Sequence, residues 1–279
     1  MHGLLQSIQT ADVAIYHVLN SFTGNKLLDT IVAHQESNAL FKGCAFLGAY
    51  WYFWFRPGID QPKNRKAIVG ILLGTMLAII VTRMLAGALP FRIRPIYDPQ
   101  LQHHLSLPIT DFEKWSSFPS DTAAFLCALA FGLTVLSRRL TIPVWIYAIG
   151  WVCFPRLYLG IHYASDLLVG SLIAVGSVWL VLRCEALYSP LATWLAALAD
   201  SKPQWFYGAG FVVSYEMAAI FWDVRSPMNG LLKLVHTEKH HPAVFLTIAA
   251  VAALCALALG AYLALSPRTE ATSTVHRIA

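Results

Sequence analysis

The stretch RLYLGIHYASDLLVGSLIAVGSVWLVLR, residues 156–183, decides what kind of fold this chain adopts. Its second part, 166–183, is an apolar run of about the length that crosses a lipid bilayer as a helix. Its first part places Arg156, His162 and Asp166 at the edge of that run, where ionisable side chains are costly and usually functional. The stretch therefore indicates a membrane helix with a polar site at one end.

The composition of the whole chain agrees with a membrane protein. Of 279 residues, 57% are hydrophobic and 13% are charged, with a mean hydropathy of +0.57, whereas soluble domains carry about 25% charged residues. We expect an all-α fold, a polytopic transmembrane helical bundle of about six to seven spans with an N-terminal interfacial helix. The net charge of +5 forms no basic patch interleaved with aromatics, so we expect the bilayer as a partner and no nucleic acid.

Apolar runs long enough to span a bilayer can be placed directly on the sequence. The six candidate spans are 39–55, 67–89, 122–137, 142–160, 166–183 and 243–265. A seventh, 205–222, is interrupted by Glu216. Its carboxylate would pair with an Arg or contact substrate, or else the segment is interfacial and does not span. Residues 4–33 mix apolar and polar positions at helical spacing, which predicts an interfacial or partly inserted helix.

Basic residues in short loops predict the orientation. Four Lys or Arg lie between residues 56 and 66, and two more at 138–139, so both loops are expected to be cytoplasmic. The loops 90–121 and 156–165 then face the opposite side of the membrane. Polar residues of both loops are therefore expected on one surface.

Two arginines and a serine in the first of these loops favour an anionic ligand. Arg92 and Arg94 carry planar forks of donors that match phosphate oxygens, although lipid headgroups would also attract them. Ser120 in SSFPSDTAA (116–124) is placed to cap a helix. The free N–H groups of that helix start would bind phosphate, or the serine is an ordinary cap.

His162 and Asp166 are four residues apart. On a continuous helix they would share a face, so Asp166 could orient one ring nitrogen and leave the other to attack. That arrangement is typical of a nucleophile with its orienting group. A metal pair is the alternative, but no third ligand has suitable spacing.

Taken together, these pieces resemble the signature of the type-2 phosphatidic acid phosphatases (PAP2), the superfamily that also includes the vanadium haloperoxidases, in its membrane-bound bacterial lipid phosphatase branch. That signature is a Lys, six residues and Arg-Pro; then Pro-Ser-Gly-His; then Ser-Arg, five residues, His, three residues and Asp. Arg94-Pro95, Pro119-Ser120 and Arg156…His162…Asp166 match it in this order. The resemblance covers about residues 90–170.

The resemblance implies roles for these residues. His162 would attack phosphorus and form a phosphohistidine, Asp166 would orient it, and Arg94, Arg156 and Ser120 would hold the phosphoryl oxygens. Arg92 is a further phosphate-binding candidate. The family works without a metal, so neither a metal nor another cofactor is expected. The implied domains are an N-terminal segment, 1–37, a PAP2-like catalytic core, 38–186, and a C-terminal extension, 187–279, with an amphipathic segment and two spans.

The chain departs from the signature at three positions. The first Lys falls at Gly87, where Arg83 or Arg92 would have to substitute, and Pro155 replaces the Ser before the motif's Arg. The histidine of Pro-Ser-Gly-His, the family's general acid, is Thr122 here. A threonine hydroxyl cannot serve as that acid near neutral pH.

Three explanations for Thr122 remain open from the sequence. A neighbour substitutes, with His103, His104 and Asp121 as candidates; or the chain only binds or transports phospholipids; or the leaving group needs no acid. A phosphate leaving a diphosphate has its last pKa near ~6 and can depart unprotonated. We therefore expect a phosphatase of a lipid-linked phosphate or diphosphate, with polyprenyl (undecaprenyl) diphosphate as the expected substrate. Its active site is expected to face the exterior of a bacterial inner membrane. A lipid phosphotransferase is the alternative.

Overall fold

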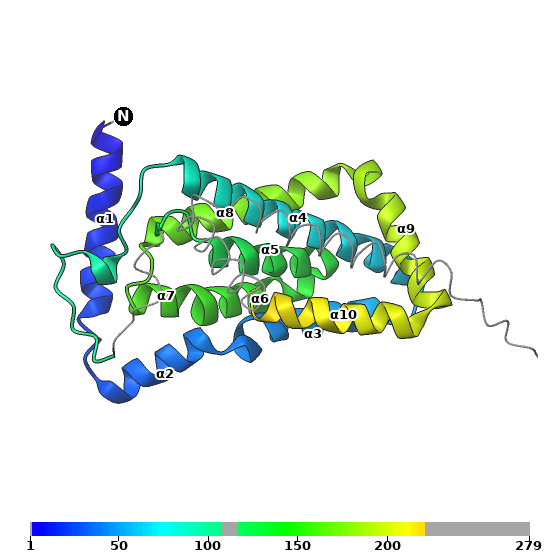
Figure 1. Cartoon of the computed structure of the whole chain (residues 1–279), viewed down its shortest axis with the longest axis horizontal. Coiled ribbons are helices and arrows are strands. Elements are labelled where there is room, and N and C mark those ends of the chain that lie inside the picture. Colours follow the sequence, from blue (N-terminus) through cyan, green and yellow to red (C-terminus); the bar gives the residue numbers. More distant parts are fainter. Residues whose placement is uncertain (1, 108–115, 221–279) are drawn as a thin grey trace, which may run out of the picture. The chain divides into compact units, whose positions relative to one another are not determined.

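The fold is a bundle of helices, in a computed structural model that describes residues 2–107 and 116–220 (Figure 1). Three helical runs are long and apolar enough to cross a membrane: α4 (Gln61–Ala88), the run Arg138–Tyr158, and α8 (Ala164–Arg183). The run Arg138–Tyr158 contains η3 (Arg138–Leu140), α6 (Thr141–Tyr147), the π-helical turn η4 (Ala148–Cys153) and α7 (Phe154–Tyr158). No strand occurs within the described ranges.

The prediction of six to seven spans is confirmed only in part. Candidate 39–55 is divided into η1 (Leu40–Cys44) and α3 (Ala45–Phe55), and candidate 122–137 is the apolar but shorter α5 (Asp121–Leu136). Candidate 205–222 largely coincides with α10 (Pro203–Ala218), a helix of 16 residues. Candidate 243–265 lies outside the described residues. Among the described residues, three helical runs are thus long enough to span a membrane.

The N-terminal segment forms two helices where the sequence predicts one over 4–33. These are α1 (His2–Asn20) and α2 (Lys26–Ser37). Gly24, with φ +96°, adopts the left-handed region between them, and the Asn25 side chain accepts hydrogen bonds from the N–H groups of Leu27 and Leu28 to start the second helix. Its interfacial position stays a prediction.

All described helices belong to one compact unit. The domain boundaries expected after residues 37 and 186 stay predictions. The amphipathic segment predicted in the C-terminal extension corresponds to residues 189–205, which begin in α9 (Glu185–Ser201) and continue into α10.

The core of the unit is the mutual packing of α4, α5 and α8 (Figure 1). The first three turns of α5 are buried almost without exception, and small residues alternate there with Phe125, Leu126 and Leu129. Gly170 of α8 lies against the Ser120 carbonyl, where an added Cβ would stand 2.4 Å from that oxygen. Small residues that let backbones approach closely are typical of helix contacts in membranes. This approach fixes the start of α5 against the start of α8.

A buried aspartate fixes the loop after α4 against the N-terminal helices. Asp29 of α2 accepts hydrogen bonds from the Ser106 N–H (2.9 Å) and hydroxyl (2.7 Å), and from the Tyr158 hydroxyl (2.8 Å). The loop and the end of α7 are therefore joined through one carboxylate. That arrangement brings the loop's arginines to the start of α8.

We predict that Gly170→Ala destabilises the protein by about 1–3 kcal/mol, because the new methyl group would overpack the Ser120 carbonyl. Gly176→Ala in the same helix is the matched control, since a Cβ there meets nothing within 4 Å. Thermal unfolding in detergent should give a lower Tm for the first variant and an unchanged or higher Tm for the second. Equal Tm values would contradict the close α5–α8 contact.

Candidate active site

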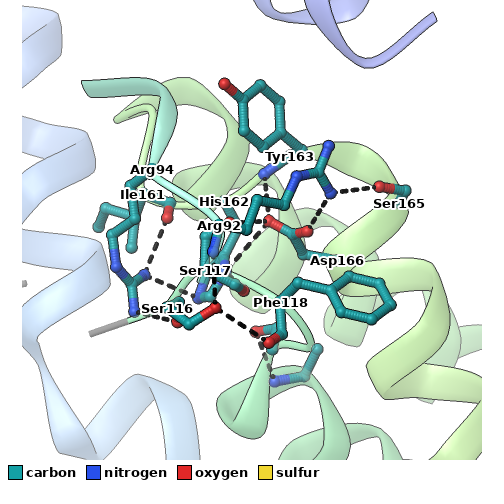
Figure 2. A network of polar contacts seen from close by, with 12 residues as sticks. Arg92, Arg94, Ser116, Ser117, Phe118, Ile161, His162, Tyr163, Ser165 and Asp166 are labelled. Atoms are coloured by element: carbon teal, nitrogen blue, oxygen red, sulfur yellow. Dashed lines mark hydrogen bonds and ion pairs between the residues drawn. The ribbon is translucent and has the colours of Figure 1, made fainter. Parts of the chain in front are cut away.

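His162 lies in the turn between α7 and α8 and is 4% exposed (Figure 2). Its Nδ1 is 2.8 Å from the Ser117 carbonyl oxygen and 3.6 Å from Asp166 Oδ2. A carbonyl only accepts hydrogen bonds, so Nδ1 carries the ring proton and donates it. The nitrogen left with a lone pair is Nε2. The local geometry therefore selects the tautomer that a nucleophilic histidine requires.

Arg94 faces that second nitrogen. Its Nη1 is 3.2 Å from His162 Nε2 and donates to the Ile161 carbonyl at 2.9 Å, while Nη2 donates to the Ser116 carbonyl at 3.4 Å. Because a guanidinium only donates, Nε2 is the acceptor, in agreement with the tautomer set by Ser117. Burial lowers the pKa of Arg94 to about 10, which still leaves it charged at neutral pH.

Asp166 is fully buried. Its hydrogen bonds are with residues that surround His162 rather than with the imidazole itself. Its Oδ2 accepts from the Tyr163 N–H (2.8 Å) and the Ser117 hydroxyl (2.8 Å), and Oδ1 accepts from Arg92. The sequence places Asp166 and His162 on one helix face, but α8 begins at Ala164, so His162 precedes the helix. Asp166 therefore caps its own helix and holds the Ser117 segment whose carbonyl orients the ring.

Arg92 lies between two carboxylates. Its Nη1 donates to Asp166 and to the Ser165 hydroxyl (2.8 Å), and its Nη2 donates to Asp12 of α1 at 2.6 Å. The guanidinium also stacks over the Tyr163 ring at 4.2 Å. Arg92 is thus bound to protein groups, whereas the sequence suggests it as a phosphate ligand.

Arg156 takes a different position from Arg92 and Arg94. Its Nη2 is 3.0 Å from Glu36 Oε1 and its Nη1 donates to the Val152 carbonyl at 3.2 Å. Glu36 also pairs with Lys42 at 3.3 Å. Burial disfavours the charged form of Glu36, but Arg156 and Lys42 outweigh it and lower its pKa. Among described contacts none joins Arg156 to the imidazole.

The start of α5 confirms the predicted helix cap. Ser120 is buried, and its hydroxyl accepts the Ala123 N–H at 3.4 Å, while its own N–H donates to the Asp166 carbonyl at 3.1 Å. Asp121 is paired with Arg83 at 2.6 Å. The Thr122 hydroxyl lies 3.5 Å from Asp121 Oδ1. The serine therefore joins the two helix starts.

The two loop histidines, His103 and His104, have partners other than His162. His103 Nδ1 is 2.6 Å from the Tyr16 hydroxyl and its Nε2 is 3.3 Å from the Asp98 carbonyl. The His104 N–H donates to Asn20 at 3.3 Å. In the described part of the chain, no contact brings either ring to His162.

Three residues that take part in this arrangement could not be identified from the sequence. Ser117 acts through its carbonyl, which no residue type reveals, and Glu36 lies in a helix with no motif. Asp12 is the one acidic residue among positions 1–28, and a lone carboxylate in an apolar segment is the signal that would have identified it. No group of three or more His, Cys, Asp or Glu side chains is arranged to hold a metal within residues 2–107 and 116–220.

Comparisons with known proteins bear on this arrangement. The family model described as the PAP2 superfamily matches residues 67–188. The chain is 26% identical over 166 residues to undecaprenyl-diphosphatase BcrC of Bacillus subtilis, covering 60% of this chain and 79% of that protein. Among solved structures it is similar to Aquifex aeolicus LpxE (TM-score 0.44, 25% identity, 61% and 93% of the two chains). The transmembrane PAP2-type phosphatidylglycerolphosphate phosphatase of Bacillus subtilis gives a TM-score of 0.44 at 20% identity, over 64% and 87%.

We predict that the His162 imidazole titrates below the ordinary histidine pKa of about 6.5, because burial disfavours its charged form. A lowered pKa means that the neutral ring persists to more acidic pH. NMR titration in detergent, with the resonance assigned by its loss in His162→Gln, measures this directly. A value at or above 6.5 would contradict the buried environment.

Proposed function

We propose that the chain is a membrane phosphatase of the PAP2 superfamily, whose family model matches residues 67–188, and that it hydrolyses a lipid-linked diphosphate through a phosphohistidine at His162. The observation that carries the proposal is the tautomer of His162, with Nδ1 bound to the Ser117 carbonyl and Nε2 facing Arg94. A polyprenyl diphosphate, undecaprenyl diphosphate in particular, is the proposed substrate. The name of the 26% identical relative supports that choice.

In the proposed first step, Nε2 of His162 attacks the terminal phosphorus of the diphosphate. The new N–P bond forms as the bridging P–O bond breaks, and the lipid monophosphate leaves with the electron pair. Arg94, which contacts Nε2 in the free protein, would turn to the phosphoryl oxygens, where charge is spread in the transition state. Water then cleaves the N–P bond, which releases inorganic phosphate and restores the imidazole.

Among the described residues, the position of the family's general acid offers no proton donor, and this supports a diphosphate over a monoester. The Thr122 hydroxyl is too weak an acid, and Asp121 is paired with Arg83 at 2.6 Å. His103 is engaged by Tyr16. A lipid alkoxide would need a proton to leave, whereas a lipid phosphate with a last pKa near ~6 does not.

Two further features of the proposal concern Arg156 and the membrane. Arg156, now paired with Glu36 at 3.0 Å, is proposed as a phosphate ligand that exchanges this carboxylate for substrate. The active site is proposed to face the exterior of a bacterial inner membrane, since the basic loops at 56–66 and 138–139 favour a cytoplasmic position on the other side.

Phosphate release from a polyprenyl diphosphate by detergent-purified protein, with EDTA present, tests the function. We expect release by the wild-type protein and by His104→Ala, and a loss of roughly 10³-fold or more in His162→Ala, because the nucleophile is removed. Product analysis with a lipid or glycan acceptor would detect phosphoryl transfer in place of hydrolysis. Release that persists in His162→Ala would refute the phosphohistidine.

Replacement of Thr122 by histidine should raise hydrolysis of a lipid monophosphate more than that of the diphosphate. A positioned general acid contributes about 10²–10⁴-fold where the leaving group needs a proton, so the ratio of the two kcat/KM values should move by at least tenfold toward the monoester. Thr122→Val serves as the control without an acid. An unchanged ratio in Thr122→His would count against a leaving-group basis for specificity.

A further inference from the structure

Helix α1 contributes a buried carboxylate to the start of α8. Asp12 is 3% exposed. It accepts hydrogen bonds from the N–H (2.9 Å) and the hydroxyl of Ser165, and from Arg92 Nη2 (2.6 Å). Ser165 is in the first turn of α8, where backbone N–H groups have no partner within the helix. Asp12 therefore caps α8 from another helix.

Two buried carboxylates then share one cation. Asp166, also in the first turn of α8, binds the other arm of Arg92 through Nη1. Neighbouring carboxylates in a low dielectric disfavour each other's ionised form unless a positive charge lies between them. Arg92 supplies that charge, and its guanidinium plane is held in addition by the Tyr163 ring (Figure 2). Three of its contacts are thus with α8 or the turn before it, and one is with α1.

We infer that Asp12 is a positioning residue for the reaction at His162, because it draws one arm of Arg92 away from Asp166 and leaves the Asp166 carboxylate oriented toward Ser117 and the Tyr163 N–H. Without the Asp12 carboxylate, the positive charge of the Arg92 guanidinium would be balanced by Asp166 alone. The Asp166 carboxylate would turn toward Arg92, and the hydrogen bond from the Ser117 hydroxyl (2.8 Å) would weaken. The Ser117 carbonyl that orients His162 would lose its fixed position.

This inference assigns Arg92 a role different from phosphate binding. A guanidinium bonded to Asp12, Asp166 and Ser165 uses three of its five N–H donors on protein groups and is held in place by them. The inference therefore assigns the phosphate contacts to other cations. Arg94 is the one in contact with His162 Nε2 at 3.2 Å. The inference rests on the proposed function for its kinetic consequences, whereas its structural consequence at His162 does not depend on any substrate.

The test compares Asp12→Asn with Asn20→Ala. The first removes the charge and keeps the size and an acceptor; the second removes a different anchor of the same helix, the hydrogen bond from Asn20 to the Gln102 carbonyl (2.8 Å). If Asp12 only docks α1, both variants should lower Tm and neither should change the imidazole. If Asp12 positions the site, Asp12→Asn alone should lower the His162 pKa further, because Asp166 Oδ2, 3.6 Å from Nδ1, turns away from the ring toward Arg92.

Steady-state kinetics on the polyprenyl diphosphate supply the second readout. We expect kcat of Asp12→Asn to fall about 10- to 100-fold, the cost of a misplaced reacting group, with KM little changed. Asp12→Glu, which keeps the charge, should recover part of that loss. An Asp12→Asn protein with wild-type kcat and an unshifted His162 titration would overturn the inference. Wild-type protein without phosphate release would overturn the proposed function instead, and the NMR titration would still decide the role of Asp12.

Discussion

The arrangement of the site depends on how one buried carboxylate, that of Asp166, is satisfied. An ionised carboxylate removed from water costs several kcal/mol unless it is paired and hydrogen-bonded. Its donors come from three parts of the chain: Arg92 after α4, Ser117 before α5, and the N–H of Tyr163 before α8. Packing α8 against α4 and α5 therefore requires these segments to meet at one point. The Ser117 carbonyl is fixed by the same contacts, which is why His162 has a defined tautomer.

Three arginines in this part of the protein are paired with carboxylates. Arg92 is shared by Asp12 and Asp166, Arg156 is paired with Glu36, and Arg83 is paired with Asp121. Such pairing offsets the repulsion between the positive charges and holds the side chains in place. The described contacts of Arg94 include two carbonyls and His162 Nε2, which lies 3.2 Å from its Nη1.

The departure from the PAP2 signature at Thr122 has a physical explanation. Thr122 stands where the signature has a histidine, and the adjacent Asp121 is paired with Arg83. Under the proposed function, the described residues would supply positive charge and a nucleophile without a proton donor at this position, which suits a leaving group that is already a stable anion. The two N-terminal helices carry no recognisable motif, yet they supply Asp12 to Arg92 in the loop after α4 and Glu36 to Arg156 in α7.

The helical membrane character, the cap at Ser120 and the grouping of Arg94, His162 and Asp166 could be predicted from the sequence, because apolar run length, capping chemistry and motif spacing are local properties. The sequence did not determine that 4–33 forms two helices or that His162 precedes α8, since a glycine turn and a helix start are settled by packing. Nor did it assign partners to Arg92 and Arg156. Only the tertiary structure decided these, because the pairing of buried charges depends on which segments meet, and Asp12 lies 80 residues from Arg92 along the chain.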